Sequence, residues 1–176
     1  IKEAGASAWV QLFHTGAYAF SMALEGERPV APSEVYSRYS KETPKALTVE
    51  EIHALQRRFV DAALRAKEAG FDGVEVIASA GYLITQFLSP LKNLRTDEYG
   101  GSFENRVRFP REVIEKIRAA VGPDYPLCVR MAGNDFVPGS NTDLETPKFA
   151  KMYEKAGADL ISVTGGWHET RVPQLP

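Results

Sequence analysis

The same junction occurs four times in this chain, and it constrains the fold more than any other feature of the sequence. Each time, a polar segment with helical character ends at a glycine and a short apolar run follows. The glycines are Gly5, Gly70, Gly122 and Gly157. Glycine adopts without strain the left-handed conformation that ends many helices. We therefore predict a repeated unit of strand, loop and helix, with strands in residues 8–13, 73–77, 126–130 and 159–163.

These four runs are rich in β-branched residues and lack a regular alternation of apolar and polar positions. That pattern is typical of parallel strands covered on both faces. Helices are predicted between them at residues 50–69, with Thr48 and Glu51 as a capping box, and at residues 103–121. Pro110 should kink or divide the second helix, and a third should begin near Pro147.

The repeated unit predicts an α/β protein with a parallel sheet. The alternative is an open, doubly wound sheet, but no strand is followed by G-x-G-x-x-G or a Walker A sequence. A complete (β/α)8 TIM barrel takes roughly 200 to over 400 residues. Residues 1–176 are therefore predicted to form a partial barrel of about four β/α units. Half a barrel exposes two unpaired strand edges, which favours association into a homo-oligomer.

Composition excludes several classes of protein. With 21 Lys and Arg against 23 Asp and Glu, the chain lacks the basic surplus of a nucleic-acid binder. Its single cysteine, Cys128, lies in a predicted strand and is expected in the core, and no Cys/His cluster with metal-binding spacing is present. No apolar run is long enough to span a membrane, and no segment resembles a signal peptide. The expected location is the cytoplasm.

Barrel enzymes carry their chemistry at the carboxyl ends of the strands. Those ends present Gln11, Tyr82, Arg130 and His168, an amide, a phenol, a guanidinium and an imidazole. No carboxylate pair and no nucleophile elbow occurs among them, which disfavours a glycosidase or a serine hydrolase.

Each candidate also has a structural interpretation. Arg130 needs a partner, which is either a ligand anion or a nearby acid such as Asp135. Gln11 could satisfy a neighbouring backbone group, and Tyr82 could be a packed aromatic residue. His168 lies in a glycine-rich loop and has the least core-like surroundings of the three histidines, so a functional role is favoured there.

Several segments resemble the old yellow enzyme superfamily of FMN-dependent oxidoreductases. They are Ala-Gly-Tyr-Leu-Ile at 80–84, Gln-Phe-Leu-Ser-Pro at 86–90 and the stretch 93–109. Gly-Gly-Trp-His-Glu-Thr-Arg at 165–171 is similar to the branch that contains 2,4-dienoyl-CoA reductase and 2-enoate reductase. The resemblance extends over nearly the whole chain. It implies an FMN-binding (β/α)8 barrel, of which this chain supplies roughly the third to the sixth strand.

The resemblance also implies roles for individual residues. Gln11 corresponds to the glutamine that binds the pyrimidine edge of the flavin, and Arg130 to the arginine near flavin N1 and the C2 carbonyl. Tyr82 corresponds to the tyrosine that protonates the substrate carbon, and His168 to the histidine that cooperates with it. Glu169 and Arg171 belong to the same motif and are expected on the substrate side.

Two departures from the superfamily pattern narrow the expectation. Old yellow enzymes proper carry a His/His or His/Asn pair where this chain has Ile77 and Ala80. The donors that hold an enone oxygen are therefore missing, and the imidazole comes from His168 on another strand. In addition, the usual His-x-Gly-Arg sequence ends here in Ala17 instead of arginine.

The implied activity is reduction of an activated C=C bond in a small unsaturated acid or acyl-CoA, of the enoate or 2,4-dienoyl-CoA type, with electrons from NADH or NADPH. An amine dehydrogenase or a steroid desaturase on the same scaffold remains an alternative, as does a non-catalytic half barrel without flavin. The resemblance places the flavin-phosphate loops, an iron–sulfur cluster and FAD outside this segment. The segment alone is expected to bind FMN weakly or not at all.

Overall fold

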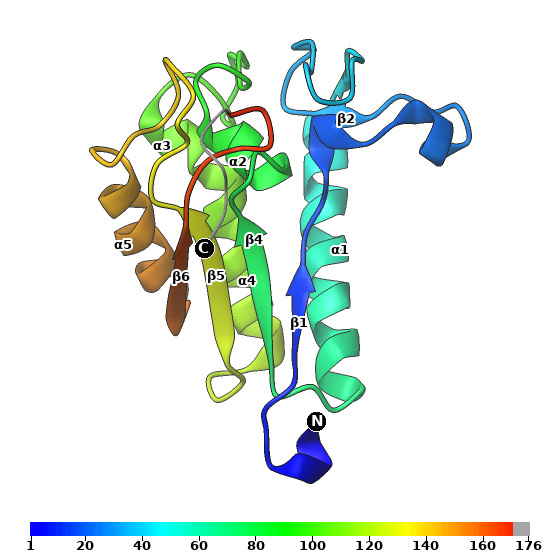
Figure 1. Cartoon of the computed structure of the whole chain (residues 1–176). Helices are drawn as coiled ribbons and strands as arrows, with labels where there is room; N and C mark the ends of the chain where they lie inside the picture. Colours follow the sequence, from blue (N-terminus) through cyan, green and yellow to red (C-terminus); the bar gives the residue numbers. More distant parts are fainter. Residues whose placement is uncertain (171–176) are drawn as a thin grey trace.

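The computed structural model describes residues 1–170 of the 176. Its centre is a four-stranded, all-parallel sheet with the strand order β1-β4-β5-β6 (Figure 1). The strands are β1 (Trp9–Leu12), β4 (Gly73–Ala78), β5 (Leu127–Ala132) and β6 (Leu160–Thr164). Neighbours in the sheet follow one another along the chain, apart from two very short strands outside it. The predicted repeat of strand, loop and helix is confirmed.

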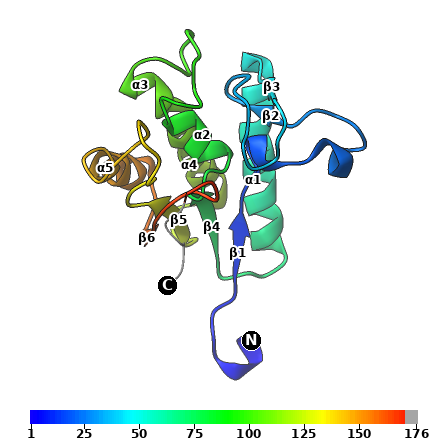
Figure 2. The ribbon, with the colours of Figure 1, turned by 45° about the horizontal axis from the view of Figure 1, so that its top comes forward.

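Three long helices connect these strands: α1 (Val49–Glu68), α4 (Arg108–Val121) and α5 (Thr146–Ala156). Figure 2 shows all three on the same side of the sheet. A doubly wound sheet would carry helices on both sides. The one-sided arrangement is that of a barrel segment, in which the helices form the outer layer.

Helix α1 begins at the capping box that the sequence predicts. The Thr48 hydroxyl accepts from the Glu51 amide at 3.2 Å, and the Glu51 carboxylate accepts from the Thr48 amide at 2.8 Å. Two backbone donors at the helix start are thereby satisfied. After the helix, Gly70 takes a φ of +83° and turns the chain into β4.

The stretch 103–121 forms two helices, α3 (Phe103–Arg106) and α4, which are separated at Val107. The division lies three residues before Pro110, so that the proline occupies the first turn of α4. In that turn a missing N–H costs no hydrogen bond, and the fixed φ of proline suits the helix. The predicted division is confirmed, and its place follows from this preference.

The core lies between the sheet and the three helices. Val74, Val76, Leu127 and Val129 alternate along the two central strands, point to the helices and are completely buried. The helices meet them with fully buried aliphatic and aromatic side chains: Ile52 of α1 and Phe109, Val113, Ile114 and Ile117 of α4.

The other face of the sheet differs from the expectation. Within residues 1–170 no helix covers it, and Trp9 and Phe13 at the β1 edge are 39% and 53% exposed. The prediction that both faces are covered is therefore wrong for the described part of the chain. The sequence pattern misled because Ile77 and Cys128 in the central strands are buried by their neighbours on this face as well. We call it the inner face.

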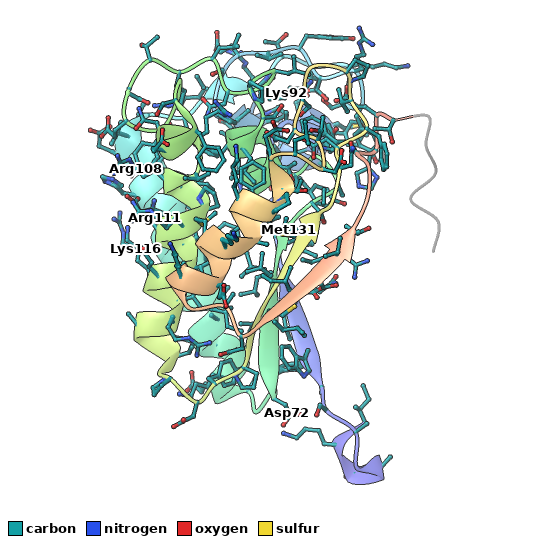
Figure 3. The ribbon with its side chains drawn as sticks, turned by 90° about the vertical axis from the view of Figure 1, so that its left-hand side faces the viewer. Asp72, Lys92, Arg108, Arg111, Lys116 and Met131 are labelled. Carbon is teal, nitrogen blue, oxygen red and sulfur yellow. The ribbon has the colours of Figure 1, made fainter. Side chains whose placement is uncertain are left out.

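The remaining short elements lie mainly around the carboxyl end of the sheet (Figure 1). They are two-residue strands β2 (Val30–Ala31) and β3 (Lys45–Ala46), 3-10 turns Gly16–Tyr18 and Ser21–Leu24, and α2 (Leu83–Leu88). A further turn, Lys2–Ala4, lies at the opposite end. Figure 3 labels Lys92 at the carboxyl end and Asp72 at the amino end. No helix in the described part of the chain is long and apolar enough to cross a membrane.

Candidate active site

Tyr82 and His168 lie side by side at the carboxyl end of the sheet. The Tyr82 hydroxyl is 2.9 Å from Nε2 of His168, and the two rings meet edge to face with centroids 5.2 Å apart. Tyr82 follows β4, and His168 follows β6, so two different β/α units supply the pair. The structure thus brings together the two residues for which the sequence predicts catalytic roles.

A short bridge joins the two loops that carry this pair. Ala80 and Trp167 form an isolated parallel β-bridge, and the His168 amide donates to the Ala80 carbonyl at 3.3 Å. Strand β5 lies between β4 and β6 in the sheet, so the bridge spans its end. Ala80 takes a φ of +62°, which is uncommon for a residue with a Cβ. Strain of this kind concentrates at functional sites.

The buried Tyr18 ring packs against both members of the pair. Its ring contacts Tyr82 at a centroid distance of 6.2 Å and His168 at 5.9 Å, and its side chain is 3% exposed. Gly81, directly before Tyr82, has a φ of +85°, and a Cβ there would lie 2.4 Å from the Tyr18 hydroxyl. Only glycine allows this approach. The contact between Gly81 and Tyr18 therefore fixes the position of the backbone at Tyr82.

Burial, and secondarily the neighbouring Tyr39, raises the pKa of Tyr82 above its ordinary value near 10. The phenol is therefore protonated at neutral pH and can donate a proton. Tyr82 also contacts Phe13, with ring centroids 5.1 Å apart. Phe13 directly follows β1, so this contact places the Tyr82 ring over the β1 side of the sheet.

Gln11 lies on the inner face in register with Glu75 of β4. Its Nε2 donates to Glu75 Oε1 at 2.5 Å, and Cys128 of β5, the next residue in the same row, donates to Glu75 Oε2 at 3.3 Å. Burial, and secondarily Glu75, raises the pKa of the Cys128 thiol to about 12. The buried position predicted for Cys128 is confirmed, and its thiol is a hydrogen-bond donor.

Arg130 is in register with Ile77. It lies two positions after Cys128 in β5, so it is on the same face as Gln11 and Glu75. No acid among residues 1–170 forms an ion pair with it. Asp135 does not pair with Arg130, because it is buried and accepts from the Ser140 hydroxyl at 2.7 Å and from Asn141. The interpretation that Arg130 pairs with a nearby acid such as Asp135 is therefore wrong for the described residues.

Asp135 instead supports the loop that carries His168. Burial raises the pKa of its carboxyl, while Ser140 and the indole of Trp167 favour the charged form. Trp167 is 1% exposed and directly precedes His168. Its Nε1 makes no hydrogen bond of standard geometry with the described residues, but it faces the Asp135 carboxylate. The loops after β5 and β6 are thus packed together.

Glu169 forms an ion pair with Lys92 at 3.5 Å, and both side chains are only 13% exposed. Figure 3 places Lys92 among the loops at the carboxyl end. Lys92 thereby balances the charge of a carboxylate that directly follows His168 in the sequence. Arg171, the other residue predicted on the substrate side, lies outside the described residues.

Sequence reasoning missed four residues of this site: Tyr18, Glu75, Asp135 as a loop support, and Trp167. Glu75 could have been found, since it is the one carboxylate inside an otherwise apolar strand. Nothing in the local sequence indicates that Tyr18 approaches Gly81, which is 63 positions away. Within residues 1–170, no group of three or more His, Cys, Asp or Glu side chains is placed to hold a metal ion.

Comparison with known proteins gives the family. The sequence pattern of the NADH:flavin oxidoreductase / NADH oxidase family matches residues 1–172. The chain belongs to this family. Its sheet and helices correspond to part of the (β/α)8 barrel of the family's members, as the repeat and the inner face indicated.

Three similar proteins place the chain within this family. A "Metal reductase" of Desulforamulus reducens is 55% identical over 175 residues, which is 99% of this chain and 26% of that protein. A solved complex of 2-naphthoyl-CoA reductase with 2-naphthoyl-CoA has a TM-score of 0.92 at 40% identity, over 97% of this chain and 28% of the other. Histamine dehydrogenase from Rhizobium sp. 4-9 has a TM-score of 0.84 at 35% identity, over 94% and 24%.

These proteins are long, multidomain members of the 2,4-dienoyl-CoA reductase-like branch, which the motif at residues 165–171 indicated. The chain spans about a quarter of the length of each of the three. The family uses FMN and a nicotinamide nucleotide.

Proposed function

We propose that this chain forms part of the active site of an FMN-dependent oxidoreductase that reduces an activated C=C bond. The substrate is a small unsaturated acid or an acyl-CoA thioester, of the enoate or 2,4-dienoyl-CoA type, and NADH or NADPH supplies the electrons. Residues 1–176 are the central part of its barrel domain. The observation that carries the proposal is the hydrogen bond of 2.9 Å between Tyr82 and His168.

Reduction of a conjugated C=C bond requires a hydride at one carbon and a proton at the other. Bound FMN would supply the hydride transfer between the nicotinamide and the substrate. Tyr82 supplies the proton to the carbon nearer the carbonyl group. A phenol alone is a weak acid at neutral pH, and the His168 ring orients its hydroxyl and returns the proton after each turnover. Glu169 and Arg171 remain predicted residues of the substrate side.

The donors on the inner face fit the flavin. The Arg130 guanidinium has no anionic partner among residues 1–170, and a half-buried charge on a sheet face requires one. Reduced flavin carries negative charge on its pyrimidine ring, which Arg130 would stabilise from a fixed position. Gln11, on the same face, offers amide groups to the polar edge of that ring. Both side chains are therefore suited to hold FMN.

Two findings support the choice of substrate. The 2-naphthoyl-CoA reductase complex contains a conjugated acyl-CoA, and its fold matches this chain with a TM-score of 0.92. Aromatic rings also surround the proton donor: Phe13, Tyr18 and Tyr39 contact Tyr82 or His168. Flat conjugated groups pack well against such rings.

Amine oxidation is the second candidate. The likeness to histamine dehydrogenase favours it, and the aromatic rings around Tyr82 could equally receive a cation. The two activities run in opposite directions, since an amine reduces the flavin, whereas an enoyl group oxidises it.

The test uses the intact protein. Its visible spectrum should show a bound flavin, and NADH or NADPH should bleach that band under anaerobic conditions. We expect a 2-enoate or a 2,4-dienoyl-CoA to restore the band, and histamine to leave the oxidised flavin unchanged. Bleaching by histamine would support amine oxidation, and a colourless protein would support the non-catalytic half barrel.

A further inference from the structure

Among the described residues of the four central strands, Glu75 is the only carboxylate on the inner face. It contacts the side-chain amide of Gln11, which is proposed to bind the flavin. Its Oε1 accepts from Gln11 Nε2 at 2.5 Å. We propose that Glu75 is a positioning residue, which fixes the orientation of the Gln11 amide toward the imide edge of the flavin. This inference rests on the proposed function, since it requires FMN at Gln11.

The hydrogen-bonding chemistry of the two side chains determines the orientation. A side-chain amide has an acceptor on one side and two donors on the other, and it can rotate by 180° when nothing constrains it. An ionised carboxylate accepts only. Gln11 must therefore turn Nε2 toward Glu75, which leaves Oε1 and one N–H available. Neither forms a hydrogen bond with other residues of the described chain, 1–170.

The sheet register fixes the position of the Glu75 carboxylate. Gln11 of β1, Glu75 of β4 and Cys128 of β5 are successive partners across three neighbouring strands. The Cys128 thiol donates to Glu75 Oε2 at 3.3 Å, so that each carboxylate oxygen has a donor from a different side. The contact with Gln11 is made by Oε1 alone, so the carboxylate holds the amide whether or not Oε2 has a donor.

The free groups of Gln11 complement the imide edge of a flavin. That edge presents an N3–H donor flanked by the C2 and C4 carbonyl oxygens. In the fixed orientation, Oε1 can accept from N3–H while the second amide N–H donates to a neighbouring carbonyl oxygen. With the amide reversed, two donors would face each other, and this unfavourable contact would weaken binding.

Glu75→Gln tests the proposal because it keeps the size of the side chain and removes the constraint. An amide at position 75 can donate or accept, so Gln11 is free to take either orientation. Cys128→Ala is the matched control, since it removes the other contact of Glu75 and leaves Gln11 constrained. The probes are FMN and 3-methyl-FMN, which lacks the N3–H, and each is titrated into flavin-free intact protein while flavin fluorescence is recorded.

We expect Glu75→Gln to raise the Kd for FMN about tenfold and the Kd for 3-methyl-FMN less than twofold, in line with the loss of a well-placed hydrogen bond. Cys128→Ala should leave both values within about twofold of the parent. In a Gln11→Leu background, Glu75→Gln should have no further effect on FMN binding.

An equal loss of affinity for both probes would show a general disturbance of the sheet and overturn the proposal, as would an unchanged Kd for FMN. If Glu75→Gln does not fold, Gln11→Leu alone decides: it should abolish the preference of the parent protein for FMN over 3-methyl-FMN, and a retained preference would refute the role of the amide. Failure of the parent protein to bind FMN at all would instead overturn the proposed function.

Discussion

Gly81 is the position where one added methyl group should disturb the site most. The residue directly precedes Tyr82, and its φ of +85° lies in the left-handed region. A Cβ at Gly81 would lie 2.4 Å from the Tyr18 hydroxyl and 2.7 to 2.8 Å from two ring carbons of Tyr18. The Tyr18 ring is 3% exposed and cannot move without displacing Tyr82 or His168, which it contacts.

The expected loss for Gly81→Ala has two parts. The left-handed conformation costs a residue with a Cβ about 1–2 kcal/mol. Forcing a methyl group into a packed region costs about 1–3 kcal/mol more. The free energy of unfolding should therefore fall by about 2–5 kcal/mol, and the Tyr82–His168 hydrogen bond should lengthen because both rings rest on Tyr18.

Gly70→Ala is the matched control. Gly70 has a φ of +83°, but a Cβ there would meet nothing within 4 Å. It should lose only the conformational part, about 1–2 kcal/mol. Urea denaturation of both variants, followed by circular dichroism, measures the difference. Equal losses for the two variants would refute the reasoning, because the contact with Tyr18 would then contribute nothing.

Two further predictions concern the scaffold. Thr48→Ala removes the capping box of α1 and should lower the free energy of unfolding by about 1 kcal/mol, whereas a loss near zero in urea denaturation would show that the cap is dispensable. The Arg95 guanidinium holds the pKa of Asp97 below its usual range. The pair therefore stabilises the fold fully at pH values above the pKa of an unfolded aspartate, which is near 4. This stabilisation disappears as the pH falls through the lower pKa of the folded state. Asp97→Asn should therefore be less stable than the parent at pH 7 and equally stable at the lowest pH at which both remain folded. Urea midpoints measured across this pH range test the prediction. A constant difference between the two proteins would contradict the stabilising role of the Arg95–Asp97 pair.

Local sequence signals predict the fold well. The capping box at Thr48, the glycines with positive φ after α1 and α5 (Gly70 and Gly157) and the division of residues 103–121 all depend on nearby residues, and the structure confirms each. Gly122 after α4 differs: its φ is +86°, but its ψ of 173° is extended, so it does not take the left-handed helical conformation. Covering of the second sheet face could not be judged in this way. Apolar residues such as Ile77 indicate burial, but they do not show whether neighbouring strands or a separate layer provides it.

The site is predictable to the extent that it lies at strand ends. Parallel strands end at one edge of the sheet, so Tyr82 and His168 were expected near each other, and they are. The supports of the pair come from contacts between distant segments. Tyr18 reaches Gly81, and Trp167 bridges to Ala80, through packing that no local pattern records.

The central claim is that Tyr82 delivers the proton to the substrate. Its most direct test is Tyr82→Phe in the intact protein, with the two half-reactions measured separately by stopped-flow absorbance. Reduction of the flavin by NADH or NADPH should remain near the parent rate, since it needs no proton from Tyr82. Oxidation of the reduced flavin by a 2,4-dienoyl-CoA or a 2-enoate should slow by about 10²- to 10⁴-fold, the usual contribution of a positioned acid. An equal fall in both half-reactions, or an unchanged rate with the unsaturated substrate, would contradict the account.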